Sequence, residues 1–83
     1  MKIYYMTWLR NRIGLAEEVI EIPEKVKTIS DLLTHMENKG DPYKQSFKER
    51  TLIYATKENK LCDHSENIYE HDELTLFSPI VGG

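Results

Sequence analysis

Cysteine is nearly absent from this chain: Cys62 is the only one among 83 residues. A single cysteine cannot form an internal disulfide, and this is typical of proteins from a reducing compartment. The sequence therefore predicts a cytoplasmic protein. A structural zinc site requires four ligands, so Cys62 and the nearby His64 are too few. We expect Cys62 to fill space in the core, and we expect the chain to bind no metal.

Long apolar runs and an excess of positive charge are also lacking. No stretch approaches the roughly 18 apolar residues that mark a membrane-spanning helix, and residues 1–5 lack the apolar core of a secretory signal. The net charge is −3, whereas proteins that bind the nucleic-acid backbone normally have a basic surface. We therefore expect neither a membrane nor a nucleic acid as a partner.

No recognisable catalytic arrangement stands out from the surface charge. We expect His35 to face solvent on a helix and His71 to lie in a turn. Neither Ser-His-Asp spacing nor a pair of carboxylates in a distinct setting is visible. The sequence therefore gives no indication that this chain catalyses a reaction by itself.

The pattern of apolar residues predicts an α+β domain. Alternating and β-branched residues predict strands at residues 3–8, 17–22, 51–56, a short edge strand from Leu61, and 74–77. Between them we expect a turn or helical stub at 9–14, one main helix, a polar connection at 43–50 and loops at 57–60 and 63–66. Because a crossover between parallel strands is right-handed, the first and last strands are expected side by side at the centre of a mixed sheet.

The main helix has clear signals at both ends. Thr28 is a natural N-cap, and Asp31 places a carboxylate in the first turn. Gly40 supplies the stop. One apolar stripe at helical spacing should pack on one face of the sheet: Ile29, Leu32, Leu33 and Met36.

The last ten residues, LTLFSPIVGG, combine a strand with a tail. Pro79 has no N–H for a sheet ladder, so we place the domain at residues 1–77 and a flexible tail at 78–83. A terminal Gly-Gly arises by chance in about one chain in 200. Residues without Cβ can pass through a narrow channel, and residues 78–83 reach roughly 20 Å when extended. The tail is therefore suited to carry its terminal carboxylate into a partner's site.

These features resemble a known family, the small sulfur-carrying subunit of molybdopterin synthase, MoaD, a ubiquitin-like β-grasp protein. The similarity covers nearly the whole length. It rests on Leu9-Arg10 and Gly14 after the first strand, on residues 20–24 (IEIPE) and 28–33 (TISDLL), and above all on residues 72–83 (DELTLFSPIVGG). Ser78 stands where the family usually has a proline, and His71 where it usually has a glycine.

The resemblance implies a reaction at Gly83. A MoeB-like enzyme would use ATP to adenylate the Gly83 carboxylate, and sulfur would replace AMP to give a thiocarboxylate. The tail residues Pro79, Ile80, Val81 and Gly82 would insert into the large subunit, MoaE, which catalyses dithiolene formation on the precursor pterin. This chain would donate sulfur without being an enzyme or binding a cofactor itself.

A partner surface is expected beside the tail. Phe77 lies on the strand face opposite Leu74 and Leu76, and we expect it to be exposed beside Met6 on the first strand. An exposed apolar patch usually marks a partner surface. Arg10 matches a family position near the interface with the large subunit.

Other functions remain open at this point. The thiamine-pathway sulfur carrier is also a β-grasp protein with a terminal Gly-Gly, although Pro79 and the Leu9-Arg10…Gly14 pattern favour the molybdopterin carrier. A ubiquitin-like modifier would use the same activated carboxylate to form isopeptide bonds. A β-grasp interaction module with an inert tail is the third alternative.

Overall fold

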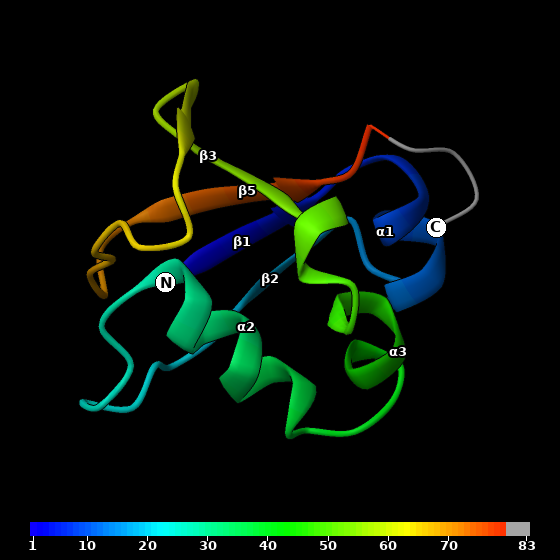
Figure 1. The fold of residues 1–83 in the computed structure, drawn as a ribbon, viewed down its shortest axis with the longest axis horizontal. Coiled ribbons are helices and arrows are strands. Elements are labelled where there is room, and N and C mark those ends of the chain that lie inside the picture. The colour runs from blue at the N-terminus through cyan, green and yellow to red at the C-terminus, as the bar shows by residue number, and fades with distance from the viewer. Residues whose placement is uncertain (80–83) are drawn as a thin grey trace.

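A mixed sheet forms one layer of the molecule, with its strands in the order β2-β1-β5-β3-β4. The computed structural model describes residues 1–79. The sheet consists of β1 (Lys2–Tyr5), β2 (Glu17–Val19), β3 (Tyr54–Lys57), β4 (Lys60–Cys62) and β5 (Glu73–Phe77). Figure 1 shows helices α1 (Thr7–Ile13), α2 (Ile29–Glu37) and α3 (Tyr43–Phe47) beside it.

The first and last strands are parallel neighbours at the centre of the sheet, which confirms the prediction. Ile3 pairs with Leu74, and Tyr5 pairs with Leu76. All four of these side chains are buried on the face that meets the helices. Because side chains alternate across a strand, the intervening residues of β1 and β5 lie on the other face.

The prediction that the first strand continues to Trp8 is wrong. The Met6 N–H still donates to the Leu76 carbonyl at 3.0 Å, but the chain enters α1 at Thr7. Leu9 and Ile13 are buried in the core, so burying this apolar side outweighs strand propensity. The predicted glycine stop is confirmed: Gly14 has φ +87° and its N–H donates to the Arg10 carbonyl at 2.9 Å.

The main helix begins where predicted. The Asp31 N–H donates to Thr28 Oγ1 at 3.1 Å, and the Thr28 N–H donates back to Asp31 Oδ2 at 3.2 Å. This reciprocal pair is a capping box. The predicted stripe of Ile29, Leu32, Leu33 and Met36 is fully buried. The helix ends at Glu37, and the chain turns at Gly40, whose φ is +88°.

Residues 43–50 are not simply a polar connection, as the sequence predicted. They contain α3, followed by a short 3-10 helix at Arg50–Leu52. Phe47 is buried, and the Arg50 guanidinium binds the Glu37 carboxylate and the Thr34 hydroxyl. Contacts with α2, rather than local sequence, therefore order this segment.

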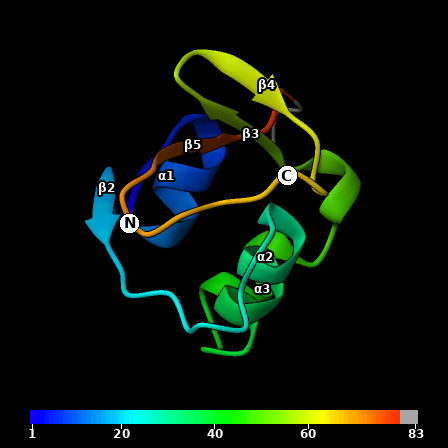
Figure 2. The ribbon, with the colours of Figure 1, turned by 90° about the vertical axis from the view of Figure 1, so that its left-hand side faces the viewer.

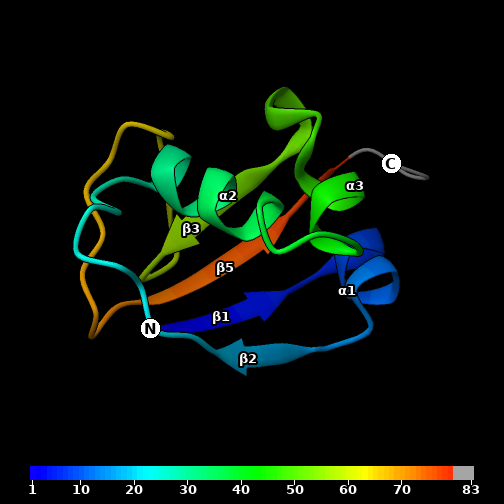
Figure 3. The ribbon, with the colours of Figure 1, turned by 90° about the horizontal axis from the view of Figure 1, so that it is seen from below.

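The second and third strands are also shorter than predicted. The second strand ends at Val19 rather than residue 22, and the third begins at Tyr54 rather than residue 51. Ile20 and Ile68 are buried in the core. Figure 2 shows the sheet curving around α2 and α3, and Figure 3 shows α1 at the end where β1 finishes. No helix within the described part is long and apolar enough to cross a membrane.

Candidate functional site

The first residue after β5, Ser78, is packed into the folded body. Phe77 is the last residue of the strand, Ser78 is 1% exposed, and Pro79 is exposed. The body thus includes Ser78, which the sequence placed at the start of the tail. The predicted insertion residues Ile80, Val81 and Gly82, and Gly83, the predicted site of reaction, lie outside the described residues.

Thr7 contacts both backbone groups of Ser78. Its Oγ1 accepts from the Ser78 N–H at 3.4 Å and lies 3.1 Å from the Ser78 carbonyl, to which it can donate. Thr7 itself has φ +56°, which is unfavourable for a β-branched residue. Such a backbone costs about 1–3 kcal/mol and persists only where surrounding contacts enforce it. Sequence reasoning missed Thr7 because it placed this residue within the first strand.

Three side chains form an apolar exit patch beside Ser78 on the open face of the sheet: Met6, Tyr54 and Phe77. Tyr54 pairs with Phe77 across β3 and β5, and their rings are 5.7 Å apart. Met6 is 48% and Tyr54 38% exposed, while Phe77 is half-buried. The structure therefore places Phe77 beside Met6, half-buried rather than exposed as the sequence predicted, and adds Tyr54.

The third predicted partner residue, Arg10, is exposed on α1. That helix lies at the same end of the sheet as the C-terminal end of β5 (Figure 3). Its neighbour Arg12 places its guanidinium 5.3 Å from the centre of the Trp8 ring. This end of the molecule thus combines an apolar patch with two exposed cations.

A partly buried polar link fixes β1, β2 and α3 relative to one another. Glu18 Oε2 accepts from the Tyr5 hydroxyl at 2.6 Å and from the Tyr43 hydroxyl at 2.8 Å. Burial, together with the hydrogen bond and charge of Glu18, raises the pKa of Tyr43 to about 12. Burial and then Glu18 raise the pKa of Tyr5 far above its usual range. Both hydroxyls therefore remain protonated donors at neutral pH.

Cys62 is buried on the inner face of β4, as predicted for a core residue. Its Sγ lies 3.4 Å from Glu66 Oε2. Burial and the Glu66 carboxylate raise the pKa of the thiol, which makes it a poorer nucleophile at neutral pH. Among residues 1–79, no group of three or more His, Cys, Asp and Glu side chains could hold a metal ion.

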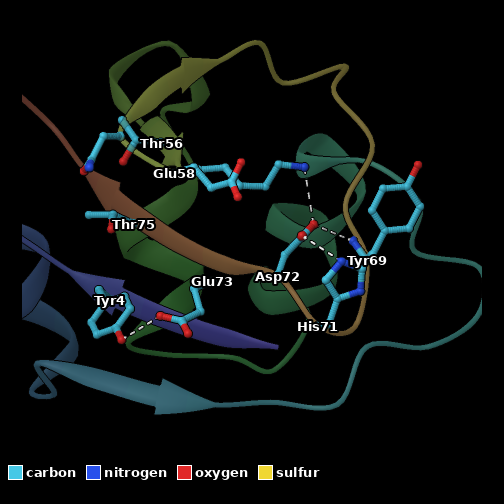
Figure 4. A pocket seen from close by; sticks show the side chains of 10 residues that line it. Tyr4, Thr56, Glu58, Tyr69, His71, Asp72, Glu73 and Thr75 are labelled. Atoms are coloured by element: carbon cyan, nitrogen blue, oxygen red, sulfur yellow. Dashed lines mark hydrogen bonds and ion pairs between the residues drawn. The ribbon is translucent and has the colours of Figure 1, made fainter.

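A polar hollow of about 620 Å³ lies at the opposite end of β5 from the exit patch. The Tyr4 hydroxyl donates to Glu73 Oε1 at 2.9 Å (Figure 4). Lys57 Nζ donates to Asp72 Oδ2 at 3.4 Å. Burial lowers the pKa of Lys57, but Asp72 and Glu66 outweigh it, so the pKa is raised and Lys57 stays charged. The charged groups that line the hollow thus pair largely with each other. Because its ammonium group is paired and protonated, Lys57 cannot act as an amine nucleophile.

Comparisons with known proteins agree with this architecture. A protein from Pyrococcus furiosus described as molybdopterin converting factor subunit 1 is similar over 95% of both chains, with 22% identity and a TM-score of 0.73. SAMP1 from Haloferax volcanii aligns with 100% of this chain and 98% of its own, at 18% identity and a TM-score of 0.72. Small archaeal modifier protein 1 of H. volcanii aligns over 96% and 97%, at 17% identity and a TM-score of 0.72.

At these identities the solved structures establish the fold alone, a ubiquitin-like β-grasp. No curated protein matches the chain at a significant level. The model of the ThiS family matches residues 3–83, nearly the entire sequence. The chain therefore belongs to the ThiS family of small ubiquitin-like sulfur carriers.

Proposed function

We propose that this protein is the sulfur-carrier subunit of a molybdopterin synthase and that Gly83 carries the sulfur. The observation that supports a sulfur carrier most directly is the extent of the family match, which runs through Gly82 and Gly83. The Pyrococcus furiosus protein, with the same fold, is described as a molybdopterin converting factor subunit. The tail pattern with Pro79 and the Leu9-Arg10…Gly14 pattern favour the same pathway.

The proposed chemistry has three steps at the terminal carboxyl group. The Gly83 carboxylate attacks the α-phosphate of ATP on a MoeB-like enzyme, which releases pyrophosphate and leaves an acyl-adenylate. A sulfur nucleophile then displaces AMP, so that the carbon–oxygen bond to AMP breaks and a carbon–sulfur bond forms. Within the large subunit, the thiocarboxylate sulfur forms a bond to the precursor pterin. Water then cleaves the carbon–sulfur bond at Gly83, which leaves the sulfur on the pterin and restores the carboxylate.

The geometry of the exit supports a tail that works away from the body. Since Ser78 is held, the free reach begins at Pro79, and residues 79–83 span roughly 16 Å when extended. This is shorter than the roughly 20 Å available if Ser78 were free. A partner must therefore bring its site close to the exit patch, where Met6, Tyr54 and Phe77 offer apolar surface.

Two related functions use the same activated carboxylate. One is the thiamine-pathway carrier, because the family match does not separate it from the molybdopterin carrier. The other is a modifier that forms isopeptide bonds, because a similar H. volcanii protein is described as a modifier protein. The products distinguish them. A sulfur carrier ends with a thiocarboxylate, whereas a modifier ends with an isopeptide bond between Gly83 and an amine.

The intact mass after incubation with a MoeB-like enzyme, ATP and a sulfur donor tests the proposal. We expect replacement of one oxygen by sulfur, mapped to Gly83, followed by pterin conversion when the large subunit is added. A variant that lacks Gly83 should keep its thermal unfolding temperature and lose transfer. Sulfur transfer by this variant, or an unchanged mass with an active enzyme, would overturn the proposal.

A further inference from the structure

Thr7 stands at the position where pairing between β1 and β5 stops. The parallel register places Tyr5 opposite Leu76. Met6 continues that ladder, because its N–H donates to the Leu76 carbonyl at 3.0 Å. One position further, β1 has already turned into α1. A backbone ladder therefore cannot continue to Ser78 from this side.

The Thr7 hydroxyl takes the place of the backbone hydrogen-bonding partner that β1 no longer offers to Ser78. Oγ1 accepts from the Ser78 N–H at 3.4 Å and lies 3.1 Å from the Ser78 carbonyl oxygen. It also lies 2.7 Å from the Met6 carbonyl. The positive φ of Thr7, +56°, is part of the turn that brings the side chain here. A threonine in this backbone conformation is unusual and points to a specific role for the side chain.

The next residue extends the constraint. Pro79 fixes its own φ and has no N–H, and the residue before a proline is confined to extended conformations. Ser78 is thus restricted from both sides: by Thr7 through its backbone groups and by Pro79 through sterics. Together they define one point and one direction of departure for the chain.

We propose that Thr7 is a positioning residue that sets where and in which direction the C-terminal segment leaves the folded body. This rests on the proposed function, in which an activating enzyme must receive the segment. A fixed exit lowers the conformational entropy lost when the segment is threaded into that enzyme. The hydroxyl acts through the backbone groups of Ser78.

Three substitutions separate the hydroxyl from the strained backbone. Thr7→Ser keeps the hydroxyl, and Thr7→Val removes it while keeping the branched shape. Thr7→Gly removes the hydroxyl but relieves the positive φ, so it should be at least as resistant to thermal unfolding as Thr7→Val. Thr56→Val, on the open face of β3, is the matched control for losing a threonine hydroxyl.

The first measurement is amide hydrogen exchange at Ser78 by NMR, in the isolated protein. We expect Thr7→Val and Thr7→Gly to speed exchange at Ser78 about tenfold, as for the loss of one hydrogen bond, while Thr7→Ser and Thr56→Val leave it unchanged. Equal exchange in all variants would overturn the proposal. This measurement needs no partner, so it is independent of the proposed function.

The second measurement is adenylation by a MoeB-like enzyme, followed as ATP–pyrophosphate exchange. We expect kcat/KM to fall three- to tenfold in Thr7→Val and Thr7→Gly, through a higher KM for the carrier, with Thr7→Ser close to the unsubstituted protein. A merely structural role predicts that activity follows unfolding temperature, so full activity in Thr7→Gly would overturn the proposal. Failure of the unsubstituted protein to be adenylated would instead overturn the proposed function, and exchange at Ser78 would still decide whether Thr7 fixes the exit.

Discussion

Single polar side chains join elements that the apolar core alone would leave free to shift. Glu18 is the clearest example, because one carboxylate oxygen accepts hydroxyl protons from β1 and from α3. The Tyr5 side chain is 1% exposed. Leaving a buried donor without an acceptor costs the full desolvation free energy of that group. The Glu18 contact therefore contributes more to stability than the partial exposure of Glu18 would indicate.

Glu18→Ala should therefore lower the free energy of unfolding by about 2 kcal/mol, because two tyrosine hydroxyls lose their acceptor. Urea denaturation measures this change. Glu17→Ala is the matched control: its carboxylate pairs with Lys2 at 2.8 Å in an exposed position, and such pairs contribute little to stability. Equal effects of the two substitutions would contradict the assignment.

The same link gives a pH dependence. The pKa of Tyr43 in the folded protein is about 12, above its ordinary value of 10.0. Because the pKa of Tyr43 is higher in the folded state than in the unfolded state, its protonated hydroxyl contributes fully to the free energy of unfolding below pH 10. This contribution is lost as the pH rises through 12. In Glu18→Ala, the pKa of Tyr43 should fall toward its ordinary value. NMR titration of the Tyr43 ring measures it, and an unchanged pKa would show that burial alone causes the shift.

Among the elements, α2 is specified locally and α3 is not. Thr28, Asp31 and the apolar stripe are all visible in the sequence, and each has the predicted role. Residues 43–47 (YKQSF) have no side-chain cap and are too few for a stable isolated helix. Burial of Phe47 and the bonds of Arg50 to α2 order them, so no local signal could have predicted this helix.

Thr28→Ala should lower the free energy of unfolding by about 1 kcal/mol, because the Asp31 N–H loses its acceptor at the helix N-terminus. Thermal or urea unfolding measures the loss. Ser30→Ala, in the first turn of the same helix, is the control and should be close to neutral. A larger loss in Ser30→Ala than in Thr28→Ala would contradict the capping role.

At the scale of the whole molecule, the helices cover one face of the sheet and leave the exit patch on the other. The patch joins residues that are far apart in sequence, Met6, Tyr54 and Phe77. It lies next to the point where the chain leaves the body. A partner that receives the segment therefore meets this surface first.

Phe77→Ala and Tyr54→Ala should each raise the Kd for the proposed large subunit about tenfold, since aromatic side chains at the centre of an interface dominate binding. Calorimetric titration measures the Kd. Val19→Ala is the control, because Val19 is 75% exposed but lies on the edge strand β2, which β1 separates from β5 and β3. A similar loss for Val19→Ala would place the interface elsewhere.

The sequence by itself determined that the first and last strands are neighbours at the centre of the sheet, and it determined the main helix with its cap, the buried stripe and the family. These depend on local periodicity, capping residues, the handedness of a crossover and a motif near the C-terminus. Only the tertiary structure decided where β1 ends, that α3 forms, and that Tyr54 joins Met6 and Phe77. It also decided that Thr7 meets Ser78, a contact between residues 71 positions apart. Such contacts depend on pairing between distant strands, and no local pattern of residues encodes them.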